Sequence, residues 1–130
     1  MNEKTKSLFL VASLILTGCE EKYTHFDYNE LKDTVIKVDI IMAEDPNLEN
    51  ARKLKTIPQH EIDGFFYDLS QLEFVSPFPN LRYPSGMCFC LYYVDGGYNI
   101  VDDSYTNIGE QNYLWCIDRE QFQNLLEKYY

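Results

Sequence analysis

The chain has few basic residues, and this shortage excludes one class of partner. In 130 residues, 11 Lys and Arg stand against 21 Asp and Glu, which gives a formal net charge of −10. Proteins that bind nucleic acid carry basic patches, so the acidic balance argues against a nucleic-acid partner. It also argues against flat contact of the domain with anionic lipid, which attracts clusters of Lys and Arg.

The sequence also lacks the motifs of the common catalytic and metal-binding sites. It contains no Gly-rich phosphate loop, no GxSxG elbow and no Ser-x-x-Lys motif. Cys88-x-Cys90 does not have the two-residue gap of a zinc knuckle. The acidic stretches at 44–49 and 102–110 lack the ligand spacing and the glycine of an EF-hand loop. We therefore predict no catalytic residue, no metal and no cofactor, and a non-catalytic role is favoured.

A long apolar segment is missing as well. The N-terminal apolar run extends from Leu8 to Leu16, nine residues including Ser13, whereas a membrane-spanning helix needs about 20 apolar residues. The run has the length of the apolar region of a signal peptide, and Lys4 and Lys6 supply its positive start. The pattern indicates an export signal rather than a permanent span.

Four residues at the end of this run carry a resemblance to a known family. Leu16-Thr17-Gly18-Cys19 resembles the lipobox of bacterial lipoproteins, in which small residues precede an obligatory cysteine. In that family the thiol receives a diacylglyceryl group, a peptidase cuts before the cysteine, and the new amino terminus is often acylated. The resemblance implies a signal peptide at 1–18, lipidation of Cys19, and attachment to the cell membrane or outer membrane on its extracytoplasmic side. An ordinary secretory peptide with a chance cysteine is the alternative.

The remainder of the chain is long enough for one domain. Residues 19–30 show no sustained periodicity and are interpreted as a lipidated tether, and 31–130 as a single α+β domain. Removal of residues 1–18, which contain Lys4, Lys6 and Glu3, changes the formal charge from −10 to −11. Because one acyl chain binds a membrane only marginally and two bind it stably, the lipid on Cys19 suffices as an anchor.

Three cysteines remain after Cys19. They are Cys88, Cys90 and Cys116, and an odd number leaves at least one of them outside any disulfide within a monomer. Two interpretations are open: a disulfide from Cys116 to Cys88 or Cys90, or three buried, reduced cysteines. A thiol enzyme would need a base beside the thiol, and neither His25 nor His60 shows a local signature of such a pair.

Alternation and turn residues predict about five strands. Residues 34–42 alternate in polarity, which predicts a half-buried strand with Ile36 on its apolar face, and 51–57 form a short return strand. Residues 87–94 and 112–117 are apolar on both faces, as central strands are. Asp95-Gly96-Gly97 predicts a hairpin turn, and three prolines exclude a central strand or helix at 76–86.

Two helices are predicted from apolar stripes. Thr56 and Gln59 have the spacing of a capping box, with Pro58 in the first turn. The stripe behind them consists of Ile62, Phe65, Phe66, Leu69 and Leu72. A second helix begins after Asp118 as N-cap, with the stripe Phe122, Leu125, Leu126 and Tyr129. Together the elements predict an α+β fold: an antiparallel sheet of about five strands with two helices packed against it. This layout is similar to that of small, uncharacterised envelope lipoproteins.

Tyrosine is the residue type that stands out. Eleven of the 130 residues are Tyr, and tyrosine is favoured at binding surfaces because it buries a large area while keeping a polar tip. Five of them follow one another in the second half of the sheet: Tyr92, Tyr93, Tyr98, Tyr105 and Tyr113. If they share an exposed face, that face is a candidate binding surface; the alternative is that they complete the core.

These observations lead to two hypotheses of different classes. The first is a lipid-anchored, non-catalytic protein-interaction module of the bacterial cell envelope, which contacts an unknown envelope protein and is held on the membrane through Cys19. An inhibitor or immunity protein is one form of it. The alternative is a small envelope thiol enzyme or hydrolase that uses Cys88, Cys90 or Cys116.

Overall fold

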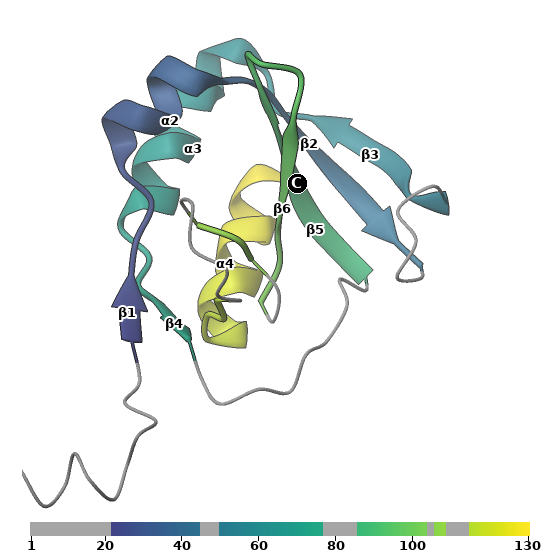
Figure 1. The fold of residues 1–130 in the computed structure, drawn as a ribbon. Coiled ribbons are helices and arrows are strands. Elements are labelled where there is room, and N and C mark those ends of the chain that lie inside the picture. The colour runs from purple at the N-terminus through teal and green to yellow at the C-terminus, as the bar shows by residue number, and fades with distance from the viewer. Residues whose placement is uncertain (1–21, 45–49, 77–85, 104–105, 109–114) are drawn as a thin grey trace, which may run out of the picture.

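The computed structural model describes five stretches of the chain: 22–44, 50–76, 86–103, 106–108 and 115–130. They form an α+β fold in which six strands make two antiparallel sheets and three helices accompany them (Figure 1). The helices lie on one side of the larger sheet. The predicted fold class is confirmed, whereas the two-stranded sheet and one of the three helices were not expected from the sequence.

The larger sheet has four strands in the order β3-β2-β5-β6. They are β3 (Arg52–Thr56), β2 (Val35–Ala43), β5 (Gly86–Tyr93) and β6 (Tyr98–Val101), and each pairs antiparallel with its neighbours. β2, β3 and β5 lie where strands were predicted at 34–42, 51–57 and 87–94, and β6 follows the predicted hairpin turn. β5 pairs with β2 along one edge and with β6 along the other, so it is an interior strand of the sheet, as predicted.

The expectation of a half-buried strand at 34–42 is wrong at the centre of β2. Asp39, predicted to face solvent, is only 2% exposed, and Ile41 on the same face is buried too. The Thr56 hydroxyl of β3 and the Lys37 ammonium lie against the Asp39 carboxylate, at 2.7 and 3.5 Å, and side chains on this face thus cover it. Ile36, predicted to be buried, is 58% exposed because a register shift takes it out of the pairing with β5.

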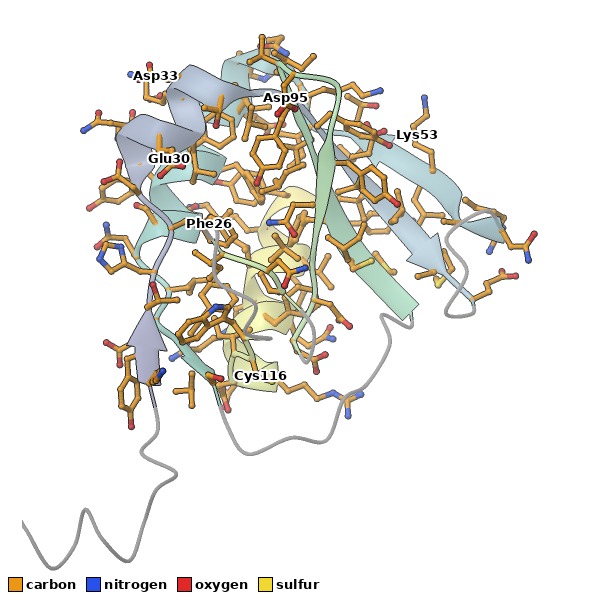
Figure 2. The ribbon with its side chains drawn as sticks, viewed as in Figure 1. Phe26, Glu30, Asp33, Lys53, Asp95 and Cys116 are labelled. Carbon is orange, nitrogen blue, oxygen red and sulfur yellow. The ribbon has the colours of Figure 1, made fainter. Side chains whose placement is uncertain are left out.

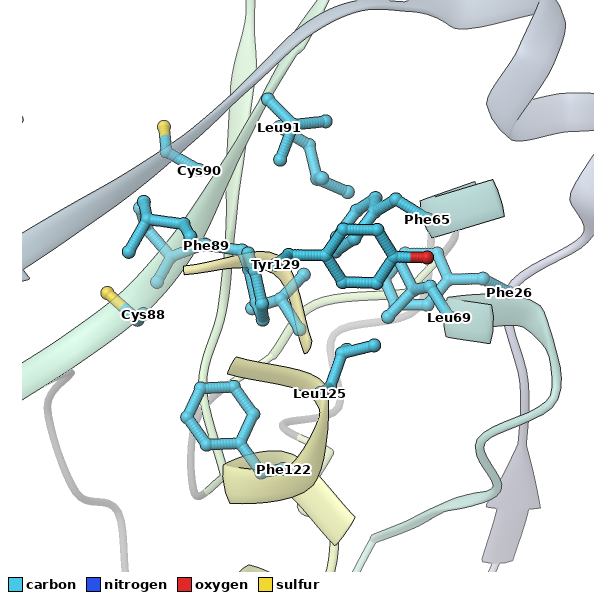
Figure 3. Close-up of a cluster of buried hydrophobic side chains, with 14 of the residues drawn as sticks. Phe26, Phe65, Leu69, Cys88, Phe89, Cys90, Leu91, Phe122, Leu125 and Tyr129 are labelled. Carbon is cyan, nitrogen blue, oxygen red and sulfur yellow. The ribbon is translucent and has the colours of Figure 1, made fainter. Parts of the chain in front are cut away.

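Two helices cover one face of this sheet, as predicted. Phe89 of β5 contacts Phe65 of α3 (Gln59–Ser70) and Phe122 of α4 (Arg119–Tyr129), with ring centroids 4.8 and 5.9 Å apart (Figure 3). Burial of each such side chain is worth about 1.5–3 kcal/mol relative to an exposed one. Cys88 and Cys90 alternate with Phe89 along β5 and lie on the face away from the helices.

Of the two predicted helix caps, the one at α4 is formed and the one at α3 is not. Asp118 caps α4, since its carboxylate accepts a hydrogen bond from the Gln121 N–H at 3.2 Å. The capping box at Thr56 and Gln59 is not formed: α3 begins after Pro58, which makes no side-chain cap bond. The Thr56 hydroxyl donates instead to Asp39 of β2 at 2.7 Å, because Thr56 still belongs to β3.

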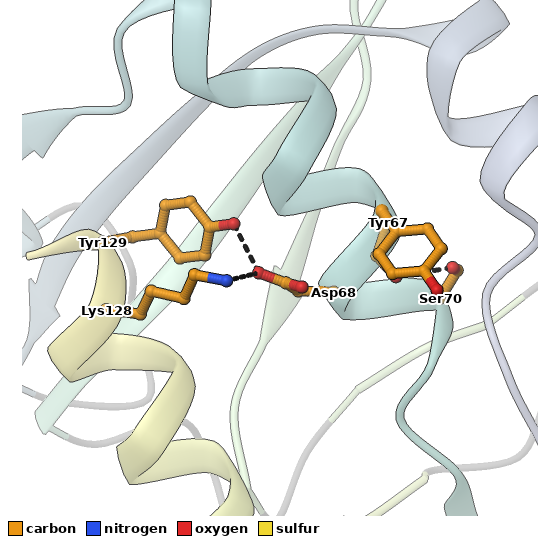
Figure 4. Close-up of polar contacts among 5 residues, drawn as sticks. All are labelled: Tyr67, Asp68, Ser70, Lys128 and Tyr129. Atoms are coloured by element: carbon orange, nitrogen blue, oxygen red, sulfur yellow. Dashed lines mark hydrogen bonds and ion pairs between the residues drawn. The ribbon is translucent and has the colours of Figure 1, made fainter.

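A polar contact joins the ends of α3 and α4. Asp68 accepts a hydrogen bond from the Tyr129 hydroxyl, and the Lys128 ammonium lies 2.7 Å from the same carboxylate oxygen (Figure 4). Partial burial by itself would raise the pKa of Asp68, but the two donors outweigh burial and hold that pKa below its usual range. These contacts of Asp68 therefore hold α3 and α4 in the position in which their apolar stripes pack together.

The N-terminal segment is more structured than the sequence suggested. Residues 19–30 were interpreted as a tether, yet β1 (Lys22–Thr24) pairs with β4 (Phe74–Ser76), and α2 (Tyr28–Thr34) follows. Phe26, between them, is 6% exposed and packs edge-on against Phe74. The described part of the expected tether, from residue 22 onward, is therefore part of the folded domain.

Two predictions fall partly outside the described residues. Of the stretch 76–86, only Ser76 and Gly86 are described, as ends of β4 and β5. Of the strand expected at 112–117, the described residues form two isolated bridges, Trp115 with Thr106 and Cys116 with Val75, and no strand of the larger sheet. None of the helices in the described stretches is long and apolar enough to cross a membrane.

Candidate functional site

A groove lies between α2 and the hairpin formed by β5 and β6. Its larger part has a volume of about 430 Å³ and is lined by Glu30 and Thr34 of α2 and by Tyr93 and Asn99 of the hairpin strands, among others. A smaller cavity of about 110 Å³, which reaches His25, shares Glu30, Thr34 and Tyr93 with it. The two cavities together form the candidate binding groove.

Local sequence features place both walls of the groove. Asp27 caps α2 by accepting a hydrogen bond from the Glu30 N–H at 2.9 Å, and this sets where the helix begins. The end of the helix is joined to the hairpin, because the Val94 N–H donates to the Thr34 carbonyl at 2.8 Å. Helix and hairpin are therefore held at a fixed separation.

The predicted turn shapes the tip of the hairpin. Gly96 has φ +96°, a conformation that L side chains rarely adopt, and its N–H donates to the Tyr93 carbonyl at 3.0 Å. The Asp95 carboxylate accepts the Gly97 N–H at 2.8 Å. The turn thus leaves Asp95 beside the groove, where its carboxylate and that of Glu30 can contact the same ligand. Both acids are labelled in Figure 2, on α2 and at the hairpin tip.

The groove is acidic and aromatic. Asp27, Glu30 and Asp95 contribute carboxylates to its lining, and no Lys or Arg belongs to the lining that the described residues provide. Burial raises the pKa of Tyr93, and the charges of Glu30 and Asp95 raise it further, so its phenol stays neutral. A negative potential beside a neutral aromatic ring attracts cations.

The three predicted tyrosines that the structure describes, Tyr92, Tyr93 and Tyr98, do not form one surface. Tyr93 and Tyr98 line the groove, and Tyr98 is 57% exposed. Tyr92 lies on the opposite face from Tyr93, as neighbours in a strand must, and the Lys37 ammonium lies 4.4 Å from its ring centroid. Tyr105 and Tyr113 lie outside the described residues. Tyr92 and Tyr98 are direct partners across β5 and β6, so their side chains share the face opposite to Tyr93. The tyrosine prediction therefore identified residues of the hairpin wall, but not one continuous aromatic face.

Sequence analysis missed the other wall. Glu30 and Thr34 come from α2, which was assigned to the tether and its flank, and Asn99 projects from β6. The available signal was the pattern Asp27–Glu30, an N-cap residue followed by an acid in the first turn. With only seven residues, α2 shows too little periodicity to stand out.

Cys88 and Cys90 do not have the surroundings of a nucleophile. Burial raises the pKa of Cys88 to about 12, and Asp102 and Cys90 add to the rise. Burial also raises the pKa of Cys90. No disulfide joins Cys88, Cys90 and Cys116 to one another. A thiol that must react as a thiolate needs the opposite shift.

The other titratable groups that the structure describes are not arranged around a common centre. In the described stretches, no three His, Cys, Asp or Glu side chains are grouped as metal ligands. His60 is exposed, and His25 lies at the edge of the smaller cavity with its Nδ1 3.0 Å from the Phe26 carbonyl. Buried Asp39 accepts the Thr56 hydroxyl and lies 3.5 Å from the Lys37 ammonium, so its charge is balanced within the sheet.

No known protein family, curated protein or solved structure matches this chain.

Proposed function

We propose that this chain is a lipid-anchored, non-catalytic domain of the bacterial cell envelope that binds a positively charged segment of another envelope protein. The anchor part of the proposal rests on the lipobox-like Leu16-Thr17-Gly18-Cys19, with the lipid on Cys19. The binding part rests on the acidic groove between α2 and the hairpin. A small inhibitor or immunity protein that occupies a basic partner is one form of this function.

The observation that carries the binding proposal is the combination of charge and aromatic surface in one groove. Glu30 and Asp95 can accept charge-assisted hydrogen bonds from Lys or Arg, and Tyr93 offers an aromatic ring beside them. A cation over an exposed ring gains about 0.5–1 kcal/mol. Val94, 68% exposed at the same place, can pack against the aliphatic stem of such a side chain.

A protein segment fits this groove better than a small metabolite. The groove is open and its polar groups are spread along α2 and the hairpin, whereas sites for small ligands enclose most of the ligand surface. A segment carrying two or more basic residues could contact Glu30 and Asp95 at once. Both contacts would weaken with salt, because the groups are near the surface.

Site-specific photo-crosslinking in the full-length lipoprotein tests the proposal. A photoreactive amino acid at position 98 should give one discrete adduct with an envelope protein. The matched control is position 130, since the Tyr130 side chain is 61% exposed but follows α4, away from the groove lining. Equal adducts at both positions would contradict the groove as the binding surface.

Charge variants in the same experiment test the chemistry. Glu30→Gln should lower the adduct yield at position 98 about five- to tenfold, since loss of one charge contact of about 1–1.4 kcal/mol changes affinity by that factor. Glu127→Gln, an exposed acid on α4, should leave the yield unchanged. An unchanged yield with Glu30→Gln would count against a cationic partner.

The thiol-enzyme hypothesis receives no support from an observation of comparable weight. It requires a reactive thiolate, and the pKa values of both Cys88 and Cys90 are raised by burial. The histidines that might serve as base, His25 and His60, are both exposed, whereas the two thiols are buried. We therefore retain the binding function as the proposal.

A further inference from the structure

The short two-stranded sheet fixes the chain close to the residue that would carry the lipid. Lys22, Tyr23 and Thr24 of β1 pair with Ser76, Val75 and Phe74 of β4 in regular antiparallel register. β4 is in turn bridged by Val75 to Cys116, just before α4. From Lys22 onward, therefore, the chain is attached to the body of the domain through β4.

Covalent geometry then limits how far the domain can stand from the membrane. Only three peptide units separate Cys19 from Lys22, and even a fully extended chain spans about 3.3–3.6 Å per residue, or roughly 10 Å here. A folded domain of about 110 residues has a radius of gyration of about 13 Å and so a diameter of roughly 34 Å. The connection is much shorter than the domain, so the point of attachment decides which end faces the lipid.

The larger cavity of the candidate binding groove lies toward the other end of the molecule, whereas the smaller one extends back to His25 beside β1. The chain rises from β1 along one side of the molecule into α2, and the tip of the β5–β6 hairpin lies at the far end from β1 and β4 (Figure 1). That end also carries Glu30, Asp33 and Asp95, which anionic lipid repels (Figure 2). The β1 end presents Lys22 and the 57% exposed Tyr23, residue types that suit a headgroup layer.

We infer that the end formed by β1 and β4 faces the bilayer at close range, and that the domain presents the groove between α2 and the hairpin away from the membrane. This inference rests on the proposed lipid anchor at Cys19 and not on what the groove binds. A partner would then reach the groove from the side opposite to the anchoring membrane, either as a soluble protein or as a domain that projects toward it.

Quenching of single fluorescent amino acids by headgroup-attached quenchers tests this orientation. The full-length lipidated protein is placed in vesicles of phosphatidylethanolamine and phosphatidylglycerol, with the fluorescent residue at position 23 or at exposed position 94. Quenching at position 23 should exceed quenching at position 94 at least threefold. Insertion of 15 Gly and Ser residues between Glu21 and Lys22 should reduce this ratio toward one, because such a linker has an average span of about 20 Å.

The outcomes separate this inference from the proposed function. Equal quenching at both positions, or stronger quenching at position 94, in protein that sediments with vesicles would overturn the orientation and leave the anchor intact. A Cys19→Ser variant should neither sediment with vesicles nor be quenched at position 23. If the unaltered protein also fails to sediment with vesicles and is not quenched, both the anchor and the orientation are contradicted. Crosslinking at position 98 would still test whether the groove binds a partner.

Discussion

Asp68 shows how a single side chain joins elements that are far apart in the sequence. Lys128 and Tyr129 both direct their donors at one oxygen of its carboxylate, across 60 and 61 residues of chain. The apolar stripes of α3 and α4 could be predicted from the sequence, because each depends on spacing within one helix. This contact could not, because it depends on how two helices lie relative to one another.

Asp68→Asn should lower the free energy of unfolding by about 1 kcal/mol at pH 7, a modest value because the carboxylate is partly exposed to water. The pKa of Asp68 is lowered in the folded protein, so its contribution is complete above the unfolded-state pKa of about 4 and is lost as the pH falls through the folded-state value. Urea titrations should show the difference at pH 7 and almost none at pH 2. A difference that is the same at both pH values would contradict this account.

The thiol of Cys88 provides a second prediction for one residue. With its pKa raised to about 12, it should react with iodoacetamide at pH 8 roughly a thousand times more slowly than a free cysteine. Peptide-resolved mass spectrometry after timed labelling measures this, and labelling in urea provides the matched control. Rapid labelling of Cys88 in the folded protein would return the thiol-enzyme hypothesis to consideration.

At the scale of elements, β1 and α2 are a strand and a helix that the sequence did not predict. The strands of the larger sheet and the helices α3 and α4 extend over enough residues for alternation or a stripe to appear. β1 has three residues and α2 seven, so neither shows a period, and their formation depends on partners such as Phe74 and Asp63 elsewhere in the chain. The same limit hid Glu30 and Thr34, which form one wall of the groove.

Phe26→Ala tests whether this N-terminal segment belongs to the domain. Replacing a buried Phe that packs on Phe74 should lower the free energy of unfolding by about 3 kcal/mol, because the change removes apolar contacts and leaves a cavity. Asn29→Ala, on the exposed side of α2, is the control and should change it by less than about 0.5 kcal/mol. If Phe26→Ala costs no more than this control, residues up to 30 would be a tether after all.

At the scale of the whole molecule, the acidic composition has two interpretations. A net charge of −10 favours solubility whatever the domain binds. Acidic side chains on α4, such as Glu120 and Glu127, contribute to this general background of negative charge. The groove differs from that background because its carboxylates are combined with the Tyr93 ring and a concave shape. Composition could reveal the charge and the tyrosines, but only the fold brings Glu30 and Asp95 to one place.

Chemical-shift mapping with a cationic probe separates these interpretations most directly. A hexa-arginine peptide is titrated into the full-length protein in neutral detergent micelles, and backbone shifts are followed by residue. We predict that saturable shifts concentrate at Glu30, Tyr93 and Tyr98 and weaken with Glu30→Gln. Shifts of similar size at Glu120 and Glu127 on α4 would show that only the overall negative charge attracts the peptide, and would contradict a binding function of the groove.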